Sequence, residues 1–248
     1  SVSAGRLRPL GSLLERLTIP GIQLHYALRK RRLEEIARAS LDEGFTQVVV
    51  FGAGFDTLAL RLSESFPAAR FIETDHPATQ KVKTRAIAAR GLSGPPNLSF
   101  IPLDLTGQNI ETELPTRGGF RPREKTLFIA EGVLMYLAPR EVDGLFRSVS
   151  RLGARGSRFA FTFMEEREDG RVAFRNAGRA VDLWLRLHRE PFNWGLRPDQ
   201  LSGFLAAHGL RVLEAGTQET LRRLYLNKPR LAGLPLAAGE CVCLAERR

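Results

Sequence analysis

Residues 47–57 of the chain read Gln47-Val48-Val49-Val50-Phe51-Gly52-Ala53-Gly54-Phe55-Asp56-Thr57. The apolar, β-branched run at the start is typical of a strand that is buried on both faces of a parallel sheet. The two glycines that follow let the backbone turn tightly and let a ligand approach without meeting a Cβ atom. A helical pattern resumes at Asp56. Together these features predict the ligand-binding turn of an open α/β sheet.

This turn differs from the dinucleotide-binding fingerprint at one position. It reads G-x-G-x-x-T, with Thr57 in place of the third glycine that allows close helix–strand packing at a pyrophosphate site. The difference disfavours NAD or FAD and favours a nucleoside cofactor without a pyrophosphate. On the glycine pattern alone, a plain structural loop is an alternative.

Length and composition are those of one folded α/β unit. The chain has 248 residues, of which 43% are hydrophobic and 26% charged, so we expect a single domain over residues 1–248. No apolar run approaches the ~20 residues that span a bilayer, and the first residues lack the apolar core of a signal peptide. We therefore expect a cytoplasmic protein without a membrane partner. Cys241 and Cys243 alternate on an apolar run and predict core residues rather than a metal site.

The chain is strongly basic, with a formal net charge of +10. Such an excess can indicate nucleic-acid binding. The arginines, however, are spread along the sequence, and the densest cluster, Arg29-Lys30-Arg31-Arg32, lies inside a predicted helix. Nucleic acid is therefore a minor alternative, and an anionic small molecule is the more natural beneficiary of the positive field.

The pattern of apolar runs predicts seven strands with helices between them. The strands are expected at 47–51, 70–74, 98–103, 126–130, 158–163, 210–214 and 239–245. Helices over residues 1–44 precede the first strand, and residues 107–125 read as a polar connecting loop with room for a short helix. A helical insertion at about 165–197 is expected to cap the site. Its aromatic residues line a pocket for an apolar substrate or form the core of the cap; they are Trp184, Phe192 and Trp194.

Carboxylates follow three of these strands. Asp75 lies about 20 residues beyond the glycines, where an acidic side chain can accept hydrogen bonds from ribose hydroxyls. Asp104 could accept from an exocyclic amine such as that of adenine while Leu105 packs on the ring, although an Asp that caps a turn reads the same way. Glu131 directly follows a buried strand, where an unpaired carboxylate is costly. It is expected to face a cationic group of the ligand.

Four motifs then occur in order. They are Val48 to Thr57 as quoted above, Glu73-Thr74-Asp75-His76-Pro77-Ala78-Thr79-Gln80 with Lys83 beyond, Leu103-Asp104-Leu105, and Ala130-Glu131-Gly132-Val133-Leu134-Met135-Tyr136-Leu137. This set resembles the leucine carboxyl methyltransferase family, in particular its bacterial branch, which includes polyketide O-methyltransferases. The resemblance implies a Rossmann-like class I methyltransferase fold. That fold has a mostly parallel seven-stranded sheet, helices on both faces, an N-terminal helical layer and a cap after the fifth strand.

The resemblance also implies S-adenosylmethionine as the cofactor and S-adenosylhomocysteine as its product. The cofactor-binding residues it implies are Arg29, Gly52, Ala53, Gly54, Asp75, His76, Asp104, Leu105, Glu131 and Gly132. An arginine of the helix before the first strand would hold the cofactor carboxylate. Bacterial relatives read Arg-Thr-Arg there, so Arg29 and Arg31 compete for this role. No residue is expected to bind a metal.

Methyl transfer from a sulfonium is an in-line displacement in which positioning does much of the catalysis. A carboxylate acceptor is already ionised at neutral pH, whereas an ordinary hydroxyl needs a general base. His76 is the candidate base, and Tyr136 could orient the acceptor. We therefore expect an O-methyltransferase that acts on a carboxylate or acidic hydroxyl of an anionic or aromatic, polyketide-like small molecule, or on a peptide C-terminus. The alternatives are a non-catalytic nucleoside-binding protein, a nucleic-acid methyltransferase and a dehydrogenase.

Overall fold

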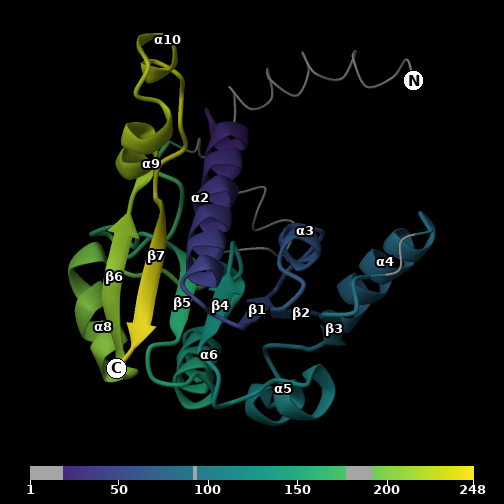
Figure 1. The fold of residues 1–248 in the computed structure, drawn as a ribbon. Coiled ribbons are helices and arrows are strands. Elements are labelled where there is room, and N and C mark those ends of the chain that lie inside the picture. The colour runs from purple at the N-terminus through teal and green to yellow at the C-terminus, as the bar shows by residue number, and fades with distance from the viewer. Residues whose placement is uncertain (1–18, 92–93, 177–191) are drawn as a thin grey trace.

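The computed structural model describes residues 19–91, 94–176 and 192–248, and these residues form a seven-stranded sheet in the order β3-β2-β1-β4-β5-β7-β6 (Figure 1). The strands are β1 (Gln47–Phe51), β2 (Arg70–Asp75), β3 (Leu98–Pro102), β4 (Thr126–Ala130), β5 (Arg158–Met164), β6 (Leu210–Gly216) and β7 (Glu240–Arg247). The first five strands pair in parallel, and β7 is antiparallel to both β5 and β6. A bulge interrupts the pairing of β6 between Val212 and Glu214.

This order distinguishes the sheet from that of dinucleotide-binding proteins. Their strand order is 3-2-1-4-5-6, with no reversed strand inserted before the sixth. Here β7 lies between β5 and β6 and runs against β5. The sheet topology therefore disfavours the dehydrogenase alternative, in agreement with the missing third glycine.

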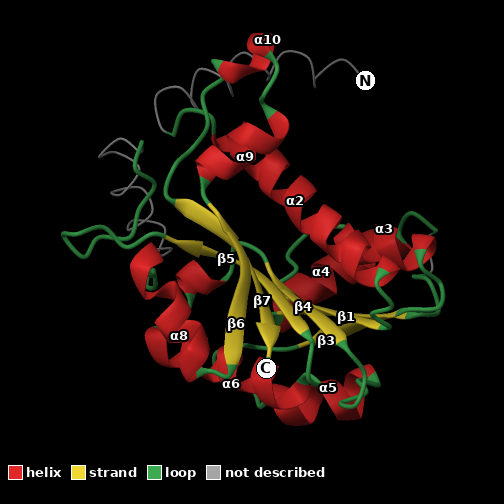
Figure 2. Ribbon diagram, turned by 60° about the vertical axis from the view of Figure 1, so that its left-hand side comes forward, coloured by secondary structure: helices red, strands yellow, loops and turns green. Residues whose placement is uncertain are grey.

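Helices cover both faces of the sheet (Figure 2). One face carries α2 (Ile22–Asp42), α3 (Leu58–Ser65) and α4 (Pro77–Ala88); the other carries α5 (Ile110–Gly118), α6 (Pro139–Leu152) and α8 (Leu201–Ala207). The short helices η1 (Leu134–Tyr136) and η2 (Pro198–Gln200) lie in connections, and α9 (Gln218–Tyr225) and α10 (Pro229–Ala232) follow β6. Helix α9 contacts α2.

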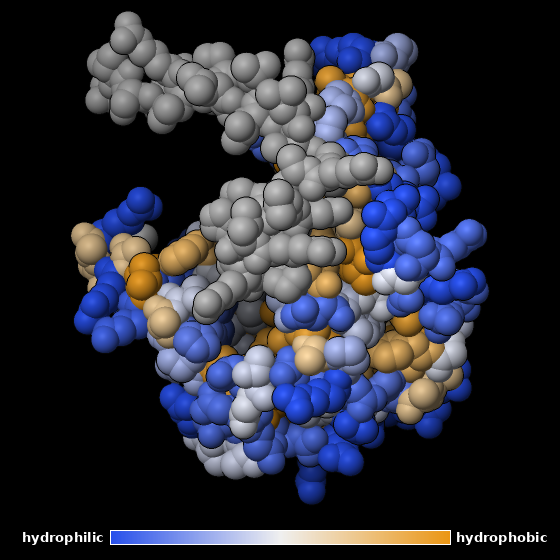
Figure 3. Space-filling view, turned by 180° about the vertical axis from the view of Figure 1, so that it is seen from behind, coloured by the Kyte–Doolittle hydropathy of each residue, from blue (hydrophilic) through white to orange (hydrophobic). Residues whose placement is uncertain are grey.

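The alternation of side chains along the buried strands builds two cores. Val48 and Val50 of β1 pack with α2 and α3, whereas Val49 and Phe51 pack with α5, α6 and α8. All five residues of β1 are buried, as expected for a central strand of a parallel sheet. Cys241 and Cys243 are buried and belong to the second of these cores. Outside the grey residues, the face seen in Figure 3 is largely hydrophilic, with smaller hydrophobic patches.

The strand predictions agree with the structure to within two residues at every end. Helix α3 begins at Leu58 rather than at Asp56, because Oδ1 of Asp56 accepts a hydrogen bond from the Leu58 N–H at 2.5 Å and so occupies the turn before the helix. Helix α5 falls inside the segment interpreted mainly as a loop. Helices α9 and α10 lie in a segment for which the sequence predicts no element.

The N-terminal layer and the cap are described only in part. Helix α2 belongs to the expected N-terminal layer, and residues 1–18 lie outside the described residues. Of the expected cap at 165–197, the described portions are 165–176 and 192–197. They contain turns and isolated bridges, such as Glu165 to Leu196, rather than a helix. Trp184 and the rest of the cap lie outside the described residues. Within the described ranges, no helix is long and apolar enough to cross a membrane.

Candidate functional site

The sheet order brings the residues that were singled out at strand ends to one edge. Strands β3, β2, β1 and β4 are neighbours and run in parallel, so their carboxyl ends meet at the same edge. Asp104, Asp75, the glycine turn and Glu131 follow these four strands in that order. Ligands of open α/β sheets bind in the crevice at this edge.

The glycine turn needs its two glycines for different reasons. Both have a positive φ, 60° at Gly52 and 53° at Gly54, which disfavours residues with a Cβ. A Cβ at Gly52 would lie 2.6 Å from Cγ2 of Val133, whereas a Cβ at Gly54 would meet nothing within 4 Å. A glycine is thus required at position 52 by packing against Val133, in the loop that follows β4. Gly54 leaves open space at the edge of the sheet. Ala53, between them, donates its N–H to the carbonyl oxygen of Thr74 at 3.1 Å.

Asp75 is held in place by backbone N–H groups of the glycine turn and of the residue that follows Asp75. One carboxylate oxygen accepts from the Gly54 N–H, and the other accepts from the His76 N–H at 2.7 Å. A carboxylate has about four lone-pair positions, so acceptor capacity is left for a ligand. His76 is exposed, and its Nδ1 accepts from the Ala78 N–H at 3.3 Å, which caps α4. The structure therefore gives His76 a structural role at the helix start beside the edge.

Glu73, on the same face of β2, forms a buried ion pair with Lys83 of α4. Glu73 is 1% exposed and Lys83 4%. Burial raises the pKa of Glu73 to about 7, although Lys83 pulls the pKa downward. Lys83 also donates to the carbonyl oxygen of Asp56, so this pair ties α4 to the end of the glycine turn.

Replacing Glu73 by glutamine is expected to change the pH dependence of stability. A carboxyl whose folded pKa is raised contributes stability that is fully present below its unfolded pKa, near 4.5, and is lost as pH rises through about 7. Over that interval the loss is of the order of 3 kcal/mol at 1.36 kcal/mol per pKa unit. Urea unfolding between pH 4.5 and 8 should show the wild type losing stability relative to the variant. The prediction would be contradicted if the free energies of unfolding of the wild type and the variant changed with pH in parallel.

Asp104 and Leu105 follow β3 at the far end of the edge. Oδ1 of Asp104 accepts from the N–H of Thr106 at 2.9 Å and from its hydroxyl at 2.7 Å, and these bonds lower the pKa of Asp104. This is the turn-capping geometry that the sequence left open as an alternative. Oδ2 takes no part in these two bonds, so the turn fixes the carboxylate without using both oxygens. Leu105 is partly buried against the core beneath it.

Glu131 lies at the other end of the edge, in a network of charged side chains. Arg29 of α2 donates from Nε to Glu131 at 2.8 Å and from Nη1 to both oxygens of Glu240 at 2.8 Å. His25 Nε2 lies 2.8 Å from the same Glu240 carboxylate. Burial alone would raise the pKa of Glu240, but Arg29 and His25 outweigh it and the pKa is lowered. Beside this network, Gly132 has a φ of 64°, and a Cβ there would lie 3.2 Å from Nη2 of Arg29.

The four basic side chains from Arg29 to Arg32 have different partners around α2. Lys30 pairs with Asp56 and, at 3.3 Å, with Glu131. Arg31 bonds Glu35 at 3.0 Å and lies over the ring of Tyr225, and Arg32 pairs with Glu214. All four cations thus have carboxylate partners, and Arg29 is the one beside both Glu131 and Gly132. This pattern gives no support to a continuous basic surface for nucleic acid.

Sequence reasoning missed Glu240 and His25. The signal for Glu240 was a carboxylate at the start of an apolar strand, the same signal that marked Glu131 at the end of one. Because β7 is antiparallel, its first residue lies at the edge where the parallel strands end. That reversal cannot be deduced from the apolar run itself.

The aromatic residues expected in the cap have separate environments. Trp194 is 8% exposed and packs with Phe204 in the core formed with α5, α6 and α8, so it does not line an open pocket. Phe192 lies 5.6 Å, ring to ring, from Tyr136, which is 42% exposed. The segment is fastened to η1, since Asn193 donates to the carbonyl oxygens of Met135 at 2.7 Å and of Tyr136 at 2.9 Å.

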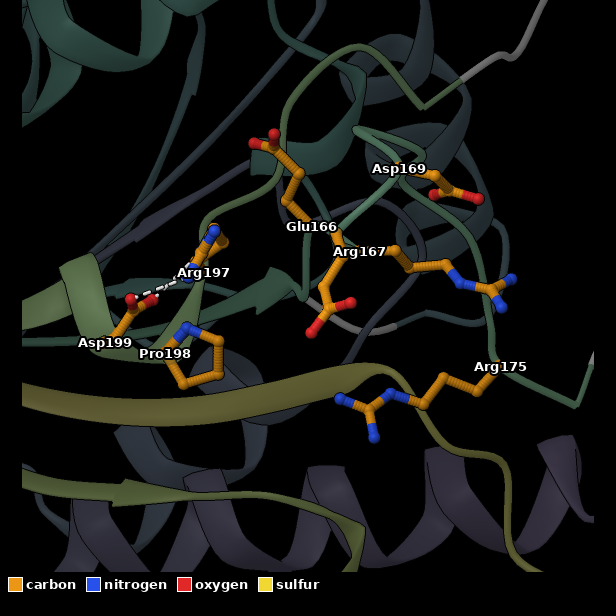
Figure 4. Close-up of a pocket in the computed structure, with 8 residues that line it drawn as sticks. Glu166, Arg167, Asp169, Arg175, Arg197, Pro198 and Asp199 are labelled. Carbon is orange, nitrogen blue, oxygen red and sulfur yellow. Dashed lines mark hydrogen bonds and ion pairs between the residues drawn. The ribbon is translucent and has the colours of Figure 1, made fainter.

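An open pocket of about 690 Å³ lies beyond the end of β5 (Figure 4). Its lining residues are Glu166, Arg167, Glu168, Asp169, Arg175, Arg197, Pro198 and Asp199. Charges of both signs face it, and Arg197 and Asp199 pair with each other at 2.9 Å. The residues predicted to bind the cofactor lie elsewhere, at the ends of β1 to β4 and, for Arg29, on α2. Within the described part of the chain, no group of three or more His, Cys, Asp and Glu could hold a metal ion.

Comparison with known proteins identifies similar chains and a similar fold. A protein of Parafrankia sp. (strain EAN1pec), provisionally named an S-adenosyl-L-methionine-dependent methyltransferase, is 34% identical over 181 residues, 71% of this chain and 55% of the relative. A similarly named protein of Frankia alni is 30% identical over 225 residues, 89% of this chain and 74% of the relative. The chain thus spans little more than half the length of the first of these relatives.

The fold is also similar to that of a solved methyltransferase. Magnesium protoporphyrin IX methyltransferase from Synechocystis PCC 6803, with bound S-adenosylhomocysteine, aligns with a TM-score of 0.55 over 92% of this chain and 85% of that one. At 12% identity this likeness concerns the fold alone, and it confirms the Rossmann-like class I architecture. The names of the relatives confirm S-adenosylmethionine as the cofactor of the group. The sequence model of the leucine carboxyl methyltransferase family matches residues 8–150, which is more than half of the chain, and the chain belongs to this family.

Proposed function

We propose that this chain is the catalytic domain of an S-adenosylmethionine-dependent methyltransferase. The observation that carries the proposal is the order of groups along the sheet edge. Asp104 and Leu105, Asp75, the glycine turn and Glu131 follow β3, β2, β1 and β4. Neighbouring strands lie about 4.8 Å apart, so the first and the last of these four groups are separated by about 14 Å along the edge. In the same order, the cofactor presents an adenine, a ribose and an amino-acid chain.

The charges at the β4 end match the amino-acid part of such a ligand. An amino acid carries a carboxylate and an ammonium group, and Arg29 and Glu131 lie side by side at 2.8 Å with the opposite charges. The guanidinium is suited to a carboxylate by its planar, forked donors. Glu131 would take the ammonium group, and Asp75 the ribose hydroxyls. Arg31, which faces Glu35 and Tyr225, is the weaker candidate for the carboxylate.

For the acceptor, we propose an oxygen of a carboxylate or acidic hydroxyl on a small molecule. Such a group is ionised near neutral pH and needs no general base. This fits the geometry of His76, whose Nδ1 is occupied at the start of α4. Tyr136, exposed beside Phe192 close to the Glu131 end, is placed to orient an aromatic or anionic acceptor. Catalysis would then consist mainly of alignment and exclusion of water.

Replacing Asp75 by alanine is expected to weaken binding of S-adenosylmethionine and S-adenosylhomocysteine by about 100-fold in calorimetric titration. Losing the charged acceptor for two ribose hydroxyls removes about 3 kcal/mol, since hydrogen bonds to charged groups contribute about 1.5–3 kcal/mol each. Asp199→Ala is the matched control, because Asp199 is an exposed aspartate that pairs with Arg197 and is not among the residues expected to bind the cofactor.

The wild-type titration tests the proposal itself. A folded sample that binds neither compound, or that prefers NAD, would refute it. Incubation with radiolabelled S-adenosylmethionine and a panel of small carboxylates and phenols then tests the acceptor class. Tight cofactor binding with no transfer to any acceptor would favour the non-catalytic alternative.

A further inference from the structure

We propose that Glu240 of β7 is a positioning residue that fixes Arg29 for the carboxylate of the cofactor. This inference rests on the proposed function and adds to it a residue that does not touch the ligand. Glu240 is the first residue of β7 and pairs in the sheet with Met164 at the end of β5. Its side chain therefore reaches the cofactor edge from the antiparallel strand, behind Arg29.

The contacts of Glu240 define the direction of the guanidinium. Both carboxylate oxygens accept from Nη1 of Arg29 at 2.8 Å, and Oε2 is also 2.8 Å from Nε2 of His25. Since the lowered pKa leaves Glu240 ionised, the imidazole donates this bond. With Nη1 on Glu240 and Nε on Glu131, the remaining nitrogen, Nη2, takes part in neither contact and is the Arg29 atom nearest to the position of a Cβ at Gly132, at 3.2 Å. Nη2 is thus the donor presented to the amino-acid end of the site.

The burial of Glu240 argues against a role in stability alone, because buried ion pairs often add no stability over apolar pairs. Its side chain is 0% exposed and that of Arg29 is 11% exposed. Burying an ion pair costs several kcal/mol of desolvation per ion, and an apolar pair of similar volume is often as stable or more so. By accepting from Nη1, Glu240 leaves Arg29 with a hydrogen bond to Glu131 from Nε. If Glu240 were absent, both ends of the guanidinium could close on Glu131, which would cancel the two charges meant for the amino acid.

Two ligands separate positioning from a general structural effect. S-adenosylhomocysteine carries the amino-acid carboxylate, whereas 5′-methylthioadenosine has the same adenosine and sulfur without it. We expect Glu240→Gln to weaken binding of S-adenosylhomocysteine by about 10-fold or more in calorimetric titration, because a charge-assisted contact to the ligand carboxylate is lost. The affinity for 5′-methylthioadenosine should stay within about twofold. Glu240→Asp keeps the charge but withdraws it by one methylene, and should change the same ratio in the same direction.

The control is Glu246→Gln, on the same strand, where Glu246 pairs with Arg211 at the surface. This variant should leave both affinities unchanged. An unchanged affinity ratio in the Glu240 variants, an equal loss for both ligands, or tighter binding of S-adenosylhomocysteine would overturn the proposal. If circular dichroism shows that Glu240→Gln does not fold, Glu240→Asp decides by the same criterion. A wild type that binds neither ligand would instead refute the proposed function.

Discussion

Replacing Arg29 by methionine is expected to lower the free energy of unfolding by about 3–5 kcal/mol at neutral pH, because removing one partner of a buried ion pair leaves an uncompensated charge. Here two carboxylates lose an arginine: Glu240, whose side chain is fully buried, and Glu131, which is 10% exposed and keeps Lys30 at 3.3 Å. His25 would be the only described neighbour left to bond Glu240. Urea unfolding followed by circular dichroism measures the change.

The destabilisation in Arg29→Met should depend on pH in a defined direction. In the wild type the lowered pKa of Glu240 contributes stability above its ordinary value of 4.5, and this contribution is lost as pH falls through the folded pKa. Without Arg29 the contribution disappears, so the difference between wild type and variant is largest above about pH 5 and shrinks in more acidic solution. A difference that is constant from pH 3 to 8 would contradict the assignment.

Arg31→Met is the matched control for Arg29→Met. Arg31 is two residues away on α2, but it is 63% exposed and its partners are Glu35 and the ring of Tyr225. Exposed pairs and cation–π contacts contribute up to about 1 kcal/mol each, so the loss should be far smaller. Affinity for S-adenosylhomocysteine should fall in Arg29→Met only. The opposite result would assign the cofactor carboxylate to Arg31.

Alanine substitutions in the glycine turn are expected to separate stability from binding. Gly52→Ala must place a Cβ 2.6 Å from Cγ2 of Val133 at a φ of 60°. The left-handed backbone costs about 1–2 kcal/mol and the overlap about 1–3 kcal/mol more. Gly54→Ala carries only the first cost, since its Cβ meets nothing. That Cβ would, however, occupy the open space where the cofactor chain is proposed to lie, and should weaken binding of S-adenosylmethionine by about 10-fold or more.

A double-mutant cycle checks the physical cause of the Gly52 effect. Shortening Val133 to alanine removes the atom that a new Cβ would meet, so Gly52→Ala should cost less in the Val133→Ala background. We expect a coupling of about 1–2 kcal/mol in urea unfolding. Additive effects would show that backbone strain alone determines the cost. Equal losses of cofactor affinity in Gly52→Ala and Gly54→Ala would argue against the proposed path of the ligand.

The strand ends were the predictable part of this protein. Each parallel strand is a short apolar run with a sharp polar boundary, so the positions of Asp75, Asp104 and Glu131 followed directly from the pattern. Because parallel strands all end at one edge, their convergence followed as well. The missing third glycine at Thr57 pointed to the kind of cofactor, and the strand order now gives an independent reason for the same conclusion.

The partners behind the edge were not predictable in the same way. His25 and Glu240 are 215 residues apart and meet only because β7 is inserted in reverse beside β5. Residues with two compatible roles were also undecided, as Asp104 shows: its carboxylate caps a turn and still faces the edge. Helices α9 and α10 were not predicted because they span only eight and four residues, too few for the helical spacing of Leu221, Leu224 and Tyr225 in α9 to stand out.

The bulge in β6 has a consequence for self-association. Unpaired edge strands offer backbone groups on which another chain can extend a sheet, and natural proteins blunt them with bulges, charges and prolines. Strand β6 has its bulge between Val212 and Glu214, and its Arg211 and Glu214 are engaged in ion pairs. At the opposite edge, β3 is five residues long and ends in Pro102, which has no N–H to donate. Both borders of the sheet are therefore poor templates for amyloid-like growth.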